Sequence, residues 1–166
     1  MSKVIVADTG PLIALALVEL LPVLQKLFSD VYVPVGVLEE ATKDSSKPGA
    51  KAIKLAVEKG WVAVHPVEMG ESFQELIEVL DQGEAEALAL AKQLNAIVLI
   101  DERRGRKVAI NHGIAVTGSA AVLIKAKKSG VIKKLKPMLE QPGEHGYRML
   151  DVLIAEVLNR VNETSD

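Results

Sequence analysis

Short apolar runs rich in Val and Ile alternate along this chain with segments whose apolar residues recur at helical spacing. This alternation is typical of βαβ units, in which helices connect neighbouring parallel strands. Such connections are right-handed and place helices on both faces of the sheet. The pattern therefore predicts an α/β fold with a central parallel sheet. The expected strands are residues 3–7, 31–34, 61–67, 97–100 and 114–117.

The expected helices follow from apolar residues three and four positions apart. Pro22 marks a break within the first helix, and Gly130 closes the helix 119–128 as a C-terminal cap. Pro66 indicates that the strand 61–67 ends there or lies at the sheet edge. The expected helices are residues 12–27, 35–42, 50–59, 72–80, 84–94, 102–112, 119–128, 131–140 and 149–162.

The length of 166 residues suits one domain, and we expect residues 1–166 to form a single unit. Hydrophobic residues make up 49% of the chain, which excludes global disorder. Aromatic residues make up only 3%, so the core must be aliphatic. The helices from about residue 131 are expected to pack on the domain or to form an interface, because the last one has an apolar face. That face consists of Leu150, Leu153, Ile154, Val157, Leu158 and Val161.

Composition excludes several classes of function. The chain has no cysteine, which rules out disulfides, thiol nucleophiles and cysteine-ligated zinc. A formal charge of −2 argues against nucleic-acid binding over the whole surface, so any such binding must be local or bridged by metal ions. The start, MSKVIVADTG, has no signal-peptide core, and no apolar run reaches the roughly 18 residues of a membrane span. We therefore expect a cytoplasmic protein.

Carboxylates stand at the ends of two expected strands. Asp8 follows the first strand, and Asp101 follows the strand 97–100. The carboxyl ends of parallel strands meet at one edge of the sheet, where α/β proteins bind ligands. Glu40 lies in the first turns of the helix after the second strand, and Glu84 begins the helix that leads into 97–100. These four acids are therefore predicted to converge on one crevice.

Carboxylates that lie close together repel, and their pKa values rise unless a positive charge lies among them. A hard divalent cation such as Mg²⁺ or Mn²⁺ supplies that charge and prefers oxygen ligands. His65, His112 and His145 are too scattered to compete for a softer metal. A metal held in this way can activate water for attack on phosphorus and neutralise the leaving oxygen. Asp8 and Asp101 are the strongest candidates for ligands.

A run of cations follows Asp101 directly in the stretch LIDERRGRKVA. Cations in the first turns of a helix oppose its macrodipole, so their placement indicates a partner with negative charge. We predict that these side chains contact a phosphate backbone beside the acids. They are Arg103, Arg104, Arg106 and Lys107.

Simpler interpretations stay open for each residue taken alone. A single Asp at a strand end is most often a helix N-cap, and the basic run by itself is most often a solvated helix face. The pairs Glu39–Glu40 and Glu84/Glu86 are, taken alone, ordinary solvated helix residues. Only the joint pattern of acids favours an enzyme.

At these same residues the chain resembles a PIN-domain protein of the VapC-like ribonuclease family. VIVADTGPLIAL resembles that family's first strand and acid, and VPVGVLEEA its second acidic segment, with Glu40 a better match than Glu39. GEAEALALA resembles the Gly-Glu-rich third segment of one PIN subfamily, and LIDERRGRKVA the fourth segment. VTGSAAVLIKAKKSGVI, at 116–132, also resembles that subfamily.

The resemblance implies a three-layer α/β/α sandwich and Mg²⁺- or Mn²⁺-dependent cleavage of RNA. It also implies a toxin of a toxin–antitoxin pair, a homodimer, and inhibition by a small antitoxin. Thr9 and Ser119 match small polar positions near the site, where they orient water or substrate. Many relatives have Asp where Glu84 stands, which changes the reach of that carboxylate. The acids carried over are Asp8, Glu40, Glu84 and Asp101.

Rival motifs are weaker. The triplet Asp8-Thr9-Gly10 matches the aspartic-protease signature, but that chemistry needs a second such loop and an all-β scaffold. A phosphatase of the Asp-x-Asp type needs an aspartate at Gly10, and a P-loop needs a Gly-Lys-Ser/Thr step that is absent. The serious alternative is a catalytically inactive PIN-like scaffold that binds RNA or a protein, because a fold alone does not confer activity.

Overall fold

The computed structural model describes residues 3–131, and these form a five-stranded sheet in the order β3-β2-β1-β4-β5. All four pairings are parallel. The strands are β1 (Val4–Ala7), β2 (Asp30–Val33), β3 (Ala63–Val64), β4 (Ile97–Leu99) and β5 (Val116–Thr117).

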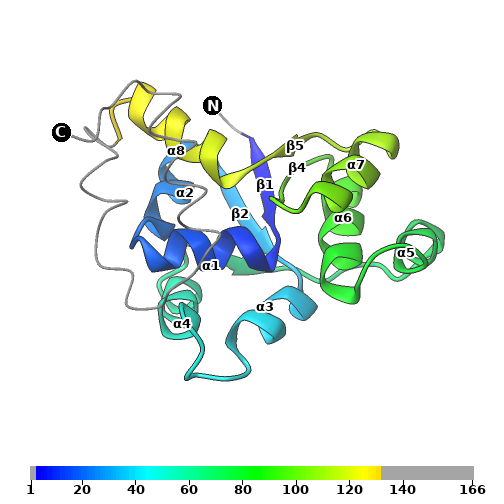
Figure 1. Ribbon diagram of the computed structural model, residues 1–166, viewed down its shortest axis with the longest axis horizontal. Coiled ribbons are helices and arrows are strands. Elements are labelled where there is room, and N and C mark those ends of the chain that lie inside the picture. Colours follow the sequence, from blue (N-terminus) through cyan, green and yellow to red (C-terminus); the bar gives the residue numbers. More distant parts are fainter. Residues whose placement is uncertain (1–2, 132–166) are drawn as a thin grey trace.

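Eight helices occur within the described residues, and they cover both faces of this sheet (Figure 1). On one side α6 contacts β1 and β4, with α5 packed against α6; on the other side α2 contacts β2 and packs with α1 and α8. The molecule is therefore a three-layer α/β/α sandwich, as the resemblance implied. The helices are α1 (Thr9–Leu17), α2 (Leu21–Leu27), α3 (Val35–Thr42), α4 (Ala50–Glu58), α5 (Glu71–Ile77), α6 (Gln82–Leu94), α7 (Arg103–Asn111) and α8 (Ser119–Lys128).

The strand order reverses at β1. The chain runs outward from β1 through β2 to β3, and then returns to place β4 on the other side of β1. Such a reversal opens a crevice at the carboxyl ends of the two central strands, because their connections leave in opposite directions. Both Asp8 and Asp101 come after these strands.

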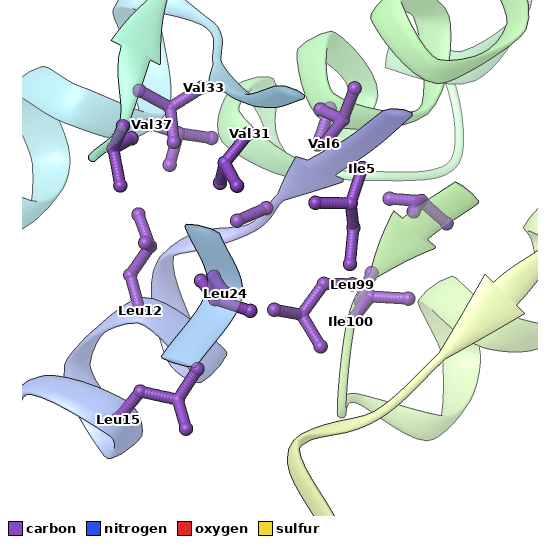
Figure 2. Close-up of a cluster of buried hydrophobic side chains, with 14 of the residues drawn as sticks. Ile5, Val6, Leu12, Leu15, Leu24, Val31, Val33, Val37, Leu99 and Ile100 are labelled. Atoms are coloured by element: carbon purple, nitrogen blue, oxygen red, sulfur yellow. The ribbon is translucent and has the colours of Figure 1, made fainter. Parts of the chain in front are cut away.

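The core is aliphatic, as expected from the composition. Figure 2 shows Leu12 and Leu24 from the first two helices gathered with Ile5 and Leu99 from the central strands and with Ile100, which follows β4. All five side chains are completely buried. Their packing fixes the ends of β1 and β4, from which the acids project.

Several boundaries differ from the prediction: the fifth strand, expected at 114–117, contains only Val116–Thr117, and two other differences have a clear physical reason. The break in the first helical stretch precedes Pro22: α1 ends at Leu17, Glu19 takes a positive φ of 59°, and Pro22 lies in the first turn of α2. Proline fits that place because the first N–H groups of a helix have no acceptor within it. The third strand is also shorter than 61–67, since its pairing ends where the N–H of His65 donates to the carbonyl of Val33 (3.0 Å).

Helix α3 begins and ends where the sequence predicts, and the other helices within residues 3–131 lie within a few residues of their predicted ranges. The helices expected at 131–140 and 149–162, with the apolar face of the latter, fall outside the part of the chain that the structure describes.

Within residues 3–131, none of the helices by itself has the length and apolarity of a membrane span. Helices α1 and α2 reach them only as a pair bent by 111°.

Two isoleucines provide a matched test of this core. Ile5→Ala removes a completely buried side chain from the central strand and should lower the free energy of unfolding by about 2–5 kcal/mol. Ile110→Ala truncates a side chain that is 61% exposed and should change it by less than about 0.5 kcal/mol. Urea denaturation measures both, and equal effects would contradict this description of the core.

Candidate functional site

Asp8 lies where the two central strands end. Its N–H donates to the carbonyl of Leu99 (3.0 Å), which extends the pairing of β1 with β4. Asp8 occupies the N-cap position of α1, but its side chain makes no capping hydrogen bond. The carboxylate is nevertheless buried, with 7% of the residue exposed. The simple interpretation as a helix cap therefore leaves this side chain unexplained.

Asp101 is held by the first residue of α8. Its Oδ1 accepts the N–H of Ser119 (2.8 Å), and its Oδ2 accepts the hydroxyl of Ser119 (2.6 Å). Ser119 is completely buried, so it acts on Asp101 and is shielded from solvent. A Cβ at Gly118 would lie 2.9 Å from Oδ1 of Asp101, which explains why glycine precedes this serine.

Glu40 reaches the same edge from α3. The hydroxyl of Thr9 donates to its Oε2 at 3.0 Å, which connects the start of α1 with α3. The same oxygen would lie 2.7 Å from a Cβ at Gly83, so Glu40 also abuts the first turn of α6. The structure thus brings Thr9 and Glu40 together, whereas Glu39 is exposed and makes no comparable contact in the described part.

Glu84 belongs to a group of three acids, two of which sequence reasoning missed. Asp81 caps α6 by accepting the N–H of Glu84 (2.9 Å). Glu102 caps α7 by accepting the N–H groups of Arg104 (2.9 Å) and Gly105 (2.7 Å). The carboxyl of Glu84 interacts with the side chains of both caps, and both interactions raise its pKa. The spacing Asp81-x-x-Glu84 resembles a capping box and was the available signal.

The pKa values of two of these acids, Asp8 and Glu84, are raised, mainly by burial. Burial raises the pKa of Asp8 to about 6, and the charges of Asp81, Glu40 and Asp101 raise it further, although the N–H of Thr9 opposes them. Burial also raises the pKa of Glu84 to about 8, helped by its hydrogen bonds to Asp81 and Glu102. The sequence-based expectation of raised pKa values is confirmed for these two residues.

Glu102 behaves in the opposite way. Burial alone would raise its pKa, but the N–H groups of Gly105 and Arg104 favour the ionised form, and Glu84 adds to their effect, so the pKa falls below the ordinary value. The ionised cap therefore accepts a hydrogen bond from a protonated Glu84.

The donors suit a hard divalent cation, because they are all carboxylate oxygens with unbalanced negative charge. Within residues 3–131, however, no three His, Cys, Asp or Glu side chains are arranged to hold a metal ion. Asp101, Glu40 and Glu84 are each bound by other groups of the protein. The acids share one edge of the sheet without forming a coordination group, and their role as ligands stays a prediction.

The predicted cations lie on α7. Arg103, Arg104 and Lys107 are exposed. Arg106 is half-buried, and its Nη1 donates to the carbonyl of Ile100 (3.1 Å). The structure therefore presents three of these side chains to solvent and uses the fourth to support the end of β4. Their contact with phosphate remains to be tested.

A family model described as DUF3368, a PIN domain, matches residues 4–163. No curated protein matches the sequence.

The raised pKa values predict how stability depends on pH in EDTA. The folded state binds Asp8 and Glu84 protons more tightly than the unfolded state, so their contribution to stability is complete below about pH 4 and is lost as pH rises through about 6 and about 8. Asp8→Asn should remove the first step and raise stability at pH 8 by on the order of 3 kcal/mol. Glu84→Gln should remove the second step.

Urea denaturation between pH 4 and pH 9 measures these steps. Asp44→Asn is the control and should leave both steps in place. Asp44 is a loop residue whose pKa is lowered, not raised, by the hydroxyl and N–H of Ser46. If the free energy of unfolding of the natural protein does not fall between pH 4 and pH 9, the raised pKa values of Asp8 and Glu84 at this edge of the sheet are wrong.

Proposed function

The chain belongs to the DUF3368 family of PIN domains, which have a nuclease fold, and we propose that it is a divalent-metal-dependent endoribonuclease. The observation that carries this proposal is the convergence of acids from separate segments on the carboxyl edge of the sheet. Asp8 is buried, and burial first, with the charges of Asp81, Glu40 and Asp101 after it, raises its pKa to about 6. Structural stability gives no reason to gather that charge, whereas cation binding does.

PIN domains typically use divalent metal ions, and in this chain four residues would hold such an ion. Asp8 and Asp101 are the central candidates, and Glu40 and Glu84 complete the set. When bound, Mg²⁺ or Mn²⁺ would help to generate the nucleophile from water and would neutralise charge on the leaving oxygen of the phosphodiester. Proton loss from Asp8 and Glu84 must accompany binding, because metal ligands are deprotonated.

Two hydroxyl groups orient the carboxylates. Ser119 directs Asp101 through both its N–H and its hydroxyl, and Thr9 directs Glu40. Partners of this kind fix the direction of a ligand and are needed for its function. We propose this orienting role for both residues. Thr9 keeps, in addition, the contact with water or substrate that the resemblance implied, whereas the buried Ser119 acts through Asp101.

The exposed cations of α7 supply the electrostatic part of RNA binding. Arg103 and Arg104 begin the helix that follows Asp101, so a phosphate backbone bound to them runs past the acidic edge. The overall charge of −2 means that binding depends on this local run and on a bridging cation.

The biological setting is a further proposal. We propose that the protein is the toxin of a toxin–antitoxin pair, that a small antitoxin inhibits it and that it forms a homodimer, as the resemblance implied. A cytoplasmic location is the expectation from the sequence. The identity of the neighbouring gene, and the mass of the protein in solution, test them.

A catalytically inactive scaffold that binds RNA or a protein is the alternative. One observation favours it: over residues 3–131 the carboxylates already bind groups of the protein and form no coordination group. Cleavage and metal dependence distinguish the two functions.

The first experiment incubates single-stranded and structured RNAs with protein plus Mg²⁺, Mn²⁺ or EDTA. We expect cleavage with either ion and none with EDTA. Glu40→Gln should reduce the cleavage rate more than about 100-fold, because loss of a ligand exceeds the usual effect of losing its hydrogen-bond partner. Glu39→Gln, an identical change at the adjacent exposed residue, should leave the rate unchanged. RNA binding without cleavage under every metal condition would support the scaffold instead.

The second experiment assigns the basic run. The double variant Arg103→Ala/Arg104→Ala should weaken RNA binding and reduce the dependence of affinity on salt, because two phosphate contacts are lost. Its Mn²⁺ affinity should stay the same. Lys51→Ala/Lys54→Ala removes the same charge from the exposed face of α4 and is the control. Equal RNA affinity for both double variants would exclude the assignment.

A further inference from the structure

Glu86, the second glutamate of GEAEALALA, is an unusual buried carboxylate. The simple interpretation as a solvated helix residue is wrong, because only 3% of Glu86 is exposed. Its Oε1 accepts the N–H of Gly36 (3.1 Å), and its Oε2 accepts Nε2 of Gln82 (3.0 Å). Burial of a carboxylate is unfavourable unless its oxygens are hydrogen-bonded, and these two contacts meet that condition.

Helices α3 and α6 make a reciprocal contact around this residue. Glu86 of α6 reaches Gly36 in the first turn of α3, and Glu40 of α3 reaches Gly83 in the first turn of α6. A Cβ at Gly36 would collide with Oε2 of Glu86 and lie 2.8 Å from its Cδ; a Cβ at Gly83 would lie 2.7 Å from Oε2 of Glu40. Each helix thus places a carboxylate at the positive end of the other.

The spacing along each helix couples these two contacts. Gly36 and Glu40 are four residues apart on α3, and Gly83 and Glu86 are three apart on α6, so each pair lies on one helix face. When Glu86 fixes the first turn of α3, the next turn of the same face carries Glu40 to Gly83. There Glu40 accepts a hydrogen bond from the hydroxyl of Thr9. The position of the exposed Glu40 at the site therefore depends on the buried Glu86, which does not itself reach the site.

We propose that Glu86 is a positioning residue: its carboxylate holds the first turn of α3 against α6 and thereby places Glu40 in the acidic cluster. The catalytic consequence of this placement rests on the proposed nuclease function, but the placement itself does not. Glu86 contacts no substrate and no reacting atom; it acts through Glu40.

Variants at Glu86 separate positioning from general stability. Glu86→Ala removes both hydrogen bonds, and Mn²⁺ affinity and kcat should fall about 10–100-fold while KM for RNA changes little. Glu86→Gln keeps an acceptor for Gly36, and the amide of Gln82 can turn to accept from the new side-chain amide, so this variant should restore both properties. Leu24→Ala, which truncates a completely buried side chain of α2, should lower the unfolding temperature without changing Mn²⁺ affinity.

The two glycines give a second test that does not change Glu86. Gly83→Ala places a methyl group against Glu40, whose exposed side chain can move aside, so Mn²⁺ affinity should fall while the unfolding temperature does not. Gly36→Ala places a methyl group against a buried carboxylate that cannot move without losing its hydrogen bonds. That variant should lose both Mn²⁺ affinity and thermal stability.

Backbone amide NMR tests the placement independently of activity. In Glu86→Ala the amide signals of Gly36, Gly83 and Thr9 should all shift, because Glu40 moves with α3; in Glu86→Gln the last two should stay in place. A shift confined to Gly36 would show that Glu86 does not position Glu40 and would overturn the proposal. If the natural protein binds Mn²⁺ and the folded Glu86→Ala variant binds it with the same affinity, the proposal is overturned as well.

The natural protein decides the proposed function separately. If it neither binds Mn²⁺ nor cleaves RNA, the nuclease proposal fails, and the NMR signals of Gly83 and Thr9 alone decide whether Glu86 positions Glu40.

Discussion

The hydrogen bond from the N–H of Asp8 to the carbonyl of Leu99 joins the two central strands where they end. It fixes the start of α1 relative to the segment that continues through Ile100 to Asp101. Because the strand order reverses at β1, the connections within residues 3–131 leave the two central strands in opposite directions, and acids from α3 and α6 can reach this edge. Ile5 and Leu99 of these two strands are completely buried in the core (Figure 2). The chemistry of the edge depends on this backbone contact.

Crowded carboxylates need compensation, and the protein provides it in three ways. Hydrogen-bond donors satisfy some of them: Ser119 binds Asp101, and Thr9 binds Glu40. Helix N-termini stabilise others, as α7 does for Glu102. The raised pKa of Glu84 shows that a proton provides the third way. A divalent cation would replace that proton and would balance the negative charge of Asp8 in its buried position.

The strands, the alternation of helices and the shared edge of Asp8 and Asp101 could be predicted from sequence, because each depends on local periodicity and on a general rule of parallel sheets. The group of Asp81, Glu84 and Glu102 could not, because it depends on which helix N-termini face one another. Capping chemistry at Asp81 and Glu102 is visible in the sequence, but their contact through Glu84 is a property of the packed helices. Burial of Glu86 escaped prediction for the same reason: it depends on the close approach of α3 through Gly36.

The two outer strands of the sheet, β3 and β5, contain only two residues each. Long, flat outer strands invite a second chain to add itself to the ladder, and very short ones offer almost no unpaired backbone for this purpose. Within residues 3–131, association through continuation of the sheet is therefore disfavoured. Side chains on the helical layers are then the favoured surface for self-assembly of this part of the molecule, and contact through them leaves the order of the five strands unchanged.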